Sequence, residues 1–167
     1  MWLTATPAHV PQAAGLFDTS VSASSIAWEQ DRQGALNSAT VDILLATHNG
    51  EKYLDEQIRS IIEQTWSDWR LLISDDQSSD TTREIVNRWI ECDSRITLVS
   101  VEKKGSAVRN FMSLLPHAEA DLVMFCDQDD VWMPDKIAKS VRASTRAGDA
   151  ENPLLVCSDM HVVDRDL

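Results

Sequence analysis

Basic residues are scarce in this chain. Its 167 residues include 15 Lys and Arg against 27 Asp and Glu, which gives a net charge of −12 at pH 7. Nucleic acids and anionic membranes bind proteins through basic patches, so this balance argues against both as partners. An acidic chain is better suited to binding a divalent cation.

Long apolar runs and paired cysteines are also lacking. No stretch approaches the roughly 18 to 20 apolar residues that span a bilayer, and the first residues lack the pattern of a signal peptide. The three cysteines, Cys92, Cys126 and Cys157, fit neither a disulfide framework nor a zinc site. Because Cys126 and Cys157 lie in apolar runs, we expect buried, reduced thiols and a soluble cytoplasmic protein.

The first 39 residues differ from the rest of the chain. They are rich in Ala, Ser, Thr and Gln, carry few charges and show no sustained hydrophobic period. This composition predicts a poorly ordered N-terminal arm over residues 1–39, followed by one folded domain over residues 40–167.

From residue 41 onward, strand and helix patterns alternate. Short apolar runs predict buried strands at VDILLAT (41–47), WRLLIS (69–74), RITLVSV (95–101), DLVMFC (121–126) and PLLVCS (153–158). Apolar residues at helical spacing predict helices between them, with these inward-facing sets: Leu54, Ile58, Ile61 and Ile62; Ile85, Val86, Trp89 and Ile90; Val108, Phe111, Met112 and Leu115; Ile137 and Val141. Thr81 and Glu84 have the spacing of a capping box. The alternation predicts an α/β fold, a Rossmann-like and mostly parallel sheet with helices on both faces.

Acidic residues follow two of the predicted strands. In open parallel sheets, ligands bind beyond the carboxyl ends of the strands, and here DDQSSD (75–80) and DQDD (127–130) lie at those ends. Carboxylates held close together repel one another unless a cation neutralises them. Mg²⁺ and Mn²⁺ prefer oxygen ligands, and Mg²⁺ typically takes one or two carboxylates together with substrate phosphates. The pattern therefore indicates a metal-assisted, nucleotide-dependent transferase.

Each acidic segment also has a simpler interpretation. A D-x-D at a strand end can be a solvated loop or a helix cap, and capping suits Ser79 and Asp80. His48 can line a site or be an ordinary surface imidazole, and Arg109 can bind a phosphate or be solvated. A receiver-like phospho-acceptor domain also places acids around Mg²⁺. Its acidic pair normally follows the first strand and a lysine the fifth, whereas here the pair follows the second strand and PLLVCSDM has no lysine.

Several of these motifs occur together and in order. VDILLATHNGEKYLDEQIRSIIEQTWSDWRLLISDDQSSDTT is followed by GSAVRN and then by DLVMFCDQDDVWMPDKI. Over about residues 41–167, the chain resembles the nucleotide-sugar-binding part of a family 2 glycosyltransferase with the GT-A fold, and most closely the bacterial rhamnosyltransferase-like group. ATHNG stands where these enzymes commonly have a proline-containing PTYN.

The resemblance implies a role for five residues at the nucleotide. Thr47, Asn49 and Glu51 would lie nearest the base and ribose. Asp76 would accept a hydrogen bond from the ring N–H of the pyrimidine, which UDP and dTDP share. Arg109 would lie near the nucleotide or its phosphates.

The resemblance also implies a metal site and a reaction. Asp127 and Asp129 match the D-x-D of the family, Asp129 would contact the ribose or the metal, and Asp130 is a further metal ligand candidate. The cofactor would be Mn²⁺ or Mg²⁺ and the donor a UDP- or dTDP-linked sugar. Transfer would invert the anomeric centre, with a carboxylate base acting on the acceptor hydroxyl.

The resemblance covers only the donor-binding part of such an enzyme. The acceptor part and the catalytic base come later in the family, so the domain is expected to be truncated and no catalytic residue is assigned. We predict sugar transfer to a saccharide or lipid-linked saccharide in surface-polysaccharide synthesis, in the cytoplasm or at the inner face of the cell membrane, with peripheral association to membrane enzymes left open. The alternative is an inactive remnant that only binds metal and nucleotide.

Overall fold

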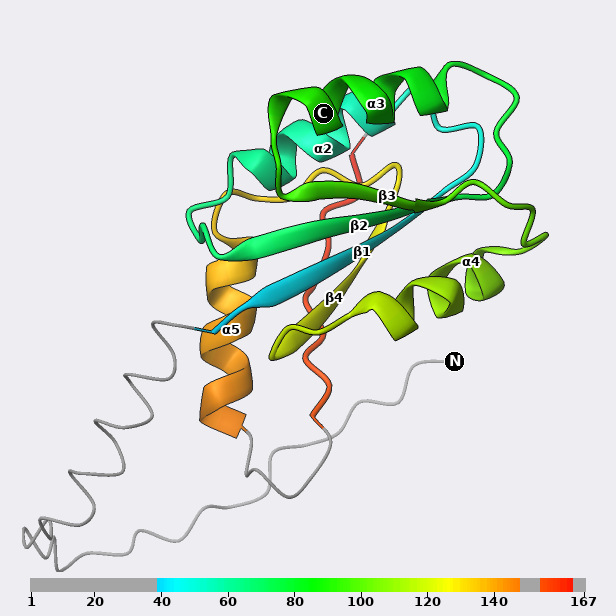
Figure 1. Ribbon diagram of the computed structural model, residues 1–167. Coiled ribbons are helices and arrows are strands. Elements are labelled where there is room, and N and C mark those ends of the chain that lie inside the picture. Colours follow the sequence, from blue (N-terminus) through cyan, green and yellow to red (C-terminus); the bar gives the residue numbers. More distant parts are fainter. Residues whose placement is uncertain (1–38, 148–153, 164–167) are drawn as a thin grey trace, which may run out of the picture.

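A computed structural model of the chain describes residues 39–147 and 154–163. The arm predicted over residues 1–39 lies outside the described residues, apart from Ala39, which packs against the core. The elements are, in chain order, β1 (Val41–Thr47), α2 (Leu54–Ile62), β2 (Trp69–Asp75), α3 (Thr82–Cys92), β3 (Ile96–Ser100), α4 (Ala107–Leu114), η1 (Leu115–His117), β4 (Leu122–Asp127) and α5 (Lys136–Ala147) (Figure 1). None of the helices in the described ranges has the length and apolar character of a membrane span.

The strands form one parallel sheet. Their order is β3-β2-β1-β4, so β1 lies between β2 and β4 although β4 comes last of the four in the chain. Thr47 is opposite Asp75 and Ala46 is opposite Asp127, and the carboxyl ends of β1, β2 and β4 therefore meet at one edge. Helices lie on both faces of the sheet, with α2 and α3 on one side and α4 on the other (Figure 1). The predicted α/β fold is confirmed.

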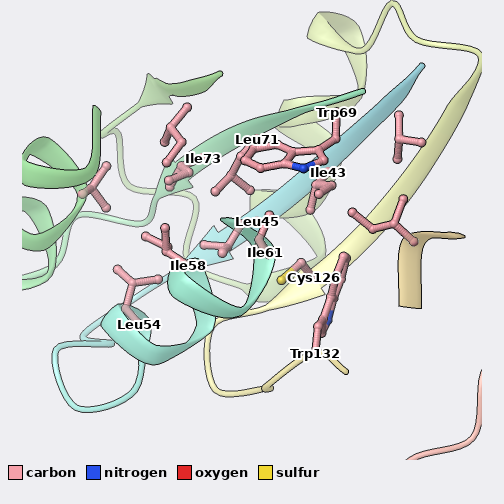
Figure 2. Packing of buried hydrophobic residues seen from close by; sticks show 14 of the residues in the cluster. Ile43, Leu45, Leu54, Ile58, Ile61, Trp69, Leu71, Ile73, Cys126 and Trp132 are labelled. Carbon is pink, nitrogen blue, oxygen red and sulfur yellow. The ribbon is translucent and has the colours of Figure 1, made fainter. Parts of the chain in front are cut away.

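Two cores of unequal size lie on the two faces of the sheet. Because side chains alternate along a strand, Ile43 and Leu45 of β1 face the larger core, which α2, α3 and α5 complete. Figure 2 shows the apolar side chains of α2 lying over these residues, with Trp132 beside Cys126. On the other face, Leu44 and Leu72 pack with Leu114 of α4. Among the described residues, α4 is the only α-helix on that face.

Helix α4 is rotated relative to the prediction. The sequence predicts that its inward-facing residues are Val108, Phe111, Met112 and Leu115. In the structure, three of them are between 38% and 69% exposed, whereas Asn110 and Leu114 are buried against the sheet. Asn110 Nδ2 donates to the carbonyl oxygens of Thr47 and Ser74 at 3.2 and 3.0 Å. These bonds to the ends of β1 and β2 fix the rotation of α4, in which Leu114 is buried and Val108 and Met112 are exposed.

The fifth predicted strand is absent. Residues 154–163 form neither helix nor strand, and Leu155 and Val162 are 82% and 92% exposed. An apolar run becomes a strand only where a sheet edge accepts its hydrogen bonds, and no such pairing forms here. The predicted buried thiol is therefore wrong for Cys157, which is exposed, and confirmed for Cys126.

A buried carboxylate fastens the amino end of the sheet. Asp42 of β1 accepts hydrogen bonds from Nε and Nη2 of Arg70 of β2, both at 2.8 Å. The backbone N–H groups of Glu119 and Ala120, just before β4, donate to the same carboxylate at 2.7 and 2.9 Å. Burial by itself raises the pKa of Asp42, but these four hydrogen bonds outweigh it and hold the pKa below its usual value. Asp42 therefore connects β1 to β2 and to the segment that leads into β4.

Apolar side chains remain exposed on the α4 side of the sheet. Val123 and Phe125 of β4 are 39% and 52% exposed, and the Phe125 ring lies edge-on to Phe111 of α4 with centroids 5.5 Å apart. Because contiguous exposed apolar surface promotes association, we expect the 167-residue chain to form dimers or larger species at micromolar concentration in sedimentation velocity. Phe125→Ser should raise the monomer fraction, and Tyr53→Ser, at an exposed aromatic of another surface, should not. A wild-type chain that stays monomeric contradicts this expectation.

Candidate functional site

A pocket of about 530 Å³ opens at the carboxyl edge of the sheet. It is lined by Ala46, Thr47, His48, Asp76, Lys103, Gly105, Ser106, Ala107, Asn110, Phe111, Asp127, Gln128 and Asp129. The predicted site residues in this lining are Thr47, Asp76, Asp127 and Asp129, and those outside it are Asn49, Glu51, Arg109 and Asp130. The structure thus brings the second acid of DDQSSD and the D-x-D of DQDD to one pocket.

His48 connects the loop after β1 to the loop after β2. Its Nδ1 lies 2.8 Å from the carbonyl oxygen of Asp76, and its Nε2 lies 3.3 Å from Nδ2 of Asn49. A carbonyl oxygen can only accept, and Asn49 Oδ1 already accepts from the N–H of Ser79. His48 Nδ1 therefore donates to the carbonyl oxygen of Asp76. Asn49 has φ of 49°, a left-handed conformation that asparagine tolerates better than most residues.

Glu51 supports the start of α3 rather than the pocket. Its carboxylate accepts from the backbone N–H and the hydroxyl of Thr81, at 3.1 and 2.9 Å. Asp80 accepts from the N–H of Thr82, the first residue of α3, as its predicted capping role requires. The capping box predicted between Thr81 and Glu84 does not form: the Thr81 side chain accepts no hydrogen bond from the first turn of α3, and its hydroxyl donates to Glu51.

The two acids of DDQSSD have different roles. Asp75 is fully buried and accepts from the N–H and hydroxyl of Ser78, so it shapes the loop from within. Asp76 faces the pocket and accepts from the backbone N–H groups of Gly105 and Lys104, which hold its pKa below the usual value. Three contacts reach its oxygens, and a carboxylate offers about four lone-pair sites. Asp76 can therefore still accept one hydrogen bond from a ligand.

The acidic loop after β4 concentrates uncompensated negative charge. Burial raises the pKa of Asp127, and the nearby carboxylates of Asp130 and Asp129 raise it further. Within the described residues, none of these three acids forms a salt bridge, and no three His, Cys, Asp or Glu side chains are grouped as a complete metal site. Asp127 and Asp129 nevertheless line the same pocket. Two carboxylates fit a cation that completes its coordination with ligand phosphates and water, not one held in a cage of protein ligands.

Lys103 and Arg109 flank the amino end of α4. Lys103 is part of the lining, as are the N-cap Ser106 and the first residue Ala107 of α4, and Arg109 lies in the first turn of this helix. In the described part of the chain, neither cation forms a salt bridge. The amino end of a helix and a free cation both favour anions, so this side of the pocket is suited to a phosphate group.

Sequence reasoning missed several residues of the pocket. Gln128, the middle residue of the D-x-D, and Asn110, in the middle of an apolar helical pattern, were assigned no role, although both line the pocket and hydrogen-bond to Thr47 at the end of β1. The one available signal was the polar Asn110 among apolar helix positions. Lys103 lay in a segment recognised only as a turn.

Comparison with solved structures defines the class of the fold. The chain superposes on TarS of S. aureus with a TM-score of 0.59 at 22% identity, covering 64% of this chain and 32% of that one. It superposes equally well on the mannosyltransferase PcManGT from Pyrobaculum calidifontis, solved with GDP-Man and Mn²⁺, at 21% identity over 71% of this chain and 39% of that one. The architecture is therefore the GT-A glycosyltransferase fold, represented here by part of its length.

Sequence comparison then gives the family. Residues 42–150 match Glycosyl transferase family 2, and the chain belongs to this family. It is 40% identical to the dTDP-rhamnosyl transferase RfbG of Shigella flexneri over 102 residues, which are 58% of this chain and 35% of RfbG. It is 34% identical over 101 residues to WfgD of Escherichia coli, named a UDP-Glc:alpha-D-GlcNAc-diphosphoundecaprenol beta-1,3-glucosyltransferase, covering 60% of this chain and 39% of WfgD. The chain thus spans well under half the length of both relatives, and the family assignment replaces the receiver-like alternative.

Proposed function

We propose that this chain is the donor-binding part of a glycosyltransferase that acts in cell-surface polysaccharide synthesis. The observation that carries the proposal is the pocket itself, in which Asp76, Asp127 and Asp129 converge with Lys103 at the carboxyl edge of a parallel sheet. Acids at one end and a free cation beside them suit a nucleoside diphosphate with a bound metal ion. The donor would be a UDP- or dTDP-linked sugar.

The relatives support this choice of donor. RfbG is named a dTDP-rhamnosyl transferase and WfgD uses UDP-Glc according to its name. TarS has been solved with UDP and with UDP-GlcNAc. Uracil and thymine both carry the ring N–H that would donate a hydrogen bond to Asp76. The lone pair that the backbone contacts leave free on Asp76 would therefore suit either base.

The metal would be Mn²⁺ or Mg²⁺, held by Asp127 and Asp129 with Asp130 close by. Such an ion neutralises the negative charge that develops on a diphosphate leaving group. Thr47 and Asn49 would lie at the base and ribose, and Glu51 would support the loop after β1 that carries them. Asp129 would lie at the ribose or the metal, and Arg109 near the phosphates. The acceptor would be a saccharide or lipid-linked saccharide, and transfer would invert the anomeric centre.

Calorimetric titration of UDP and dTDP into the purified 167-residue chain, with and without Mn²⁺, tests the proposal. Binding that requires Mn²⁺ supports a nucleotide–metal site, and sugar transfer from a matching donor would extend it to catalysis. The absence of binding under every condition, from a chain whose circular dichroism and melting show that it is folded, would identify an inactive remnant instead.

Asp76→Ala is expected to weaken nucleotide binding by about 1 to 3 kcal/mol, the range for losing a hydrogen bond to a charged group. Asp76→Asn keeps one acceptor oxygen and should lose less. The same titration with UDP measures both variants. An unchanged Kd in Asp76→Ala would remove the base contact from the proposal.

A further inference from the structure

Gln128 joins the loop after β4 to the loop after β1. Its Oε1 accepts from the hydroxyl of Thr47 and from the backbone N–H of His48, both at 2.8 Å. Its Nε2 donates to the carbonyl oxygen of His48 at 3.2 Å. The carboxamide therefore pairs with both backbone groups of His48, as a residue of a neighbouring strand does. It extends the β1–β4 ladder, whose last backbone pair is Ala46 with Asp127.

Gly50 provides the space for this carboxamide. A Cβ atom at the buried Gly50 would lie 2.6 Å from Gln128 Oε1 and 3.0 Å from the Thr47 hydroxyl oxygen. The first distance is too short for non-bonded atoms, and the second is a tight contact. Gly50 does not have a positive φ; among the described glycines, Gly105 does. Glycine is therefore needed at position 50 because it lacks a side chain, not because the backbone is left-handed.

The acidic turn depends on this one side chain. Beyond the β1–β4 ladder, the hydrogen bonds between residues 128–131 and the rest of the described chain are those of the Gln128 carboxamide. The next anchor is the N–H of Trp132, which donates to the hydroxyl of Ser60 at 3.0 Å. Without Gln128, the turn that carries Asp129 and Asp130 would be held only at its two ends.

The loop after β1 does not share this dependence. The N–H groups of Asn49 and Gly50 donate to the hydroxyls of Ser78 and Thr82 at 2.8 and 2.7 Å. His48 adds its own bond to the carbonyl of Asp76. This loop therefore keeps its place beside the loop after β2 even if the Gln128 contacts are lost.

We propose that Gln128 is a positioning residue that clamps the acidic turn to the loop after β1. The β1–β4 ladder already fixes Asp127, and the clamp sets the separation between Asp129 and Asp76, which would contact the base. A single nucleoside diphosphate with its metal can then reach both. The effect on ligand binding rests on the proposed function, whereas the clamp itself does not.

Amide hydrogen exchange in the ligand-free chain tests the clamp. Gln128→Ala should speed exchange of the His48 amide, which donates to Gln128 Oε1, by about tenfold or more, while the core strands keep their protection. Gly50→Ala, which leaves every polar group in place, should have the same effect because its Cβ displaces the carboxamide. In the Gln128→Ala background, Gly50→Ala should have no further effect. Val131→Ala, an exposed residue of the same turn, is the matched control.

Binding then tests the consequence. Gln128→Ala and Gly50→Ala are expected to weaken binding of UDP with Mn²⁺ by about 10- to 100-fold, the usual cost of losing a partner that orients metal ligands. Binding of uridine without metal should stay close to the wild-type value, because the base-facing loop keeps its own anchors. A general loss of structure would instead weaken both ligands and lower the melting temperature.

The outcomes separate the two proposals. Unchanged exchange in Gln128→Ala overturns the clamp, whatever the chain binds, as does an additive effect of the double variant. Equal losses for uridine and for UDP with Mn²⁺ overturn the positioning role. A wild-type chain that binds no nucleotide, but whose exchange responds as expected, contradicts the proposed function and leaves the clamp in place.

Discussion

Replacing Asp129 by alanine is expected to weaken metal-dependent binding of UDP or dTDP more than about 100-fold. Asp129 lines the pocket together with Asp127, and these two carboxylates are the candidate metal ligands there. Loss of a ligand should exceed the 10- to 100-fold that is typical for residues behind the ligands. Calorimetry with and without Mn²⁺ measures the effect, and nucleotide binding in the absence of metal should change much less.

Variants of other acids near this loop should weaken metal-dependent binding less than Asp129→Ala does. Asp130 adds to the local charge but lies outside the pocket lining, so Asp130→Ala should cost less than Asp129→Ala. Asp135 pairs with Lys139 on the surface of α5 and serves as the matched acid outside the pocket. If neither Asp129→Ala nor Asp130→Ala alters the Mn²⁺ dependence, the metal site must lie elsewhere.

Asp42→Ala is expected to lower the free energy of unfolding by about 3 kcal/mol, because each donor left without its acceptor costs roughly 1 to 3 kcal/mol and the half-exposed Arg70 adds little. The substitution leaves two backbone N–H groups and the Arg70 guanidinium without their acceptor at the amino end of the sheet. Urea unfolding followed by circular dichroism measures the loss. Asp68→Ala, at an exposed acid nearby, should change the free energy by less than about 0.5 kcal/mol.

The same carboxylate predicts how stability depends on pH. The pKa of Asp42 is lower in the folded chain than in the unfolded chain. Its contribution is therefore complete above the unfolded value of about 4 and is lost as the pH falls through the folded value. The difference in unfolding free energy between wild type and Asp42→Asn should shrink as the pH drops below about 4. A difference that stays constant down to pH 2 would contradict this assignment.

Sequence patterns predicted most of the fold because, in the central strands and the helices on the α2 side of the sheet, the apolar residues of the sequence are the buried ones. VDILLAT is buried along its whole length and forms β1 over the predicted residues. The convergence of DDQSSD and DQDD followed from the parallel sheet alone. Helix α4 was oriented wrongly because two hydrogen bonds from Asn110 to strand carbonyls outweigh the apolar period, and such bonds leave no trace in hydropathy.

The site was harder to predict at the level of single residues. The sequence does not distinguish a carboxylate that shapes a loop, such as Asp75, from one that supports the start of a helix, such as Glu51, or one that faces a pocket, such as Asp76. The Gln128 carboxamide acts on a residue 80 positions away, and only the sheet order brings the two together.

The placement of β4 beside β1 has a kinetic consequence. Residues 40–100 can build β1, β2 and β3 with their helices from neighbours in the chain, but the pocket needs a strand that joins β1 across 81 residues, as the Thr40–Asp121 contact shows. Closing so long a loop costs entropy and slows folding. The pocket therefore forms only when the sheet closes, so nucleotide capture during refolding would report the final step of assembly rather than the formation of secondary structure.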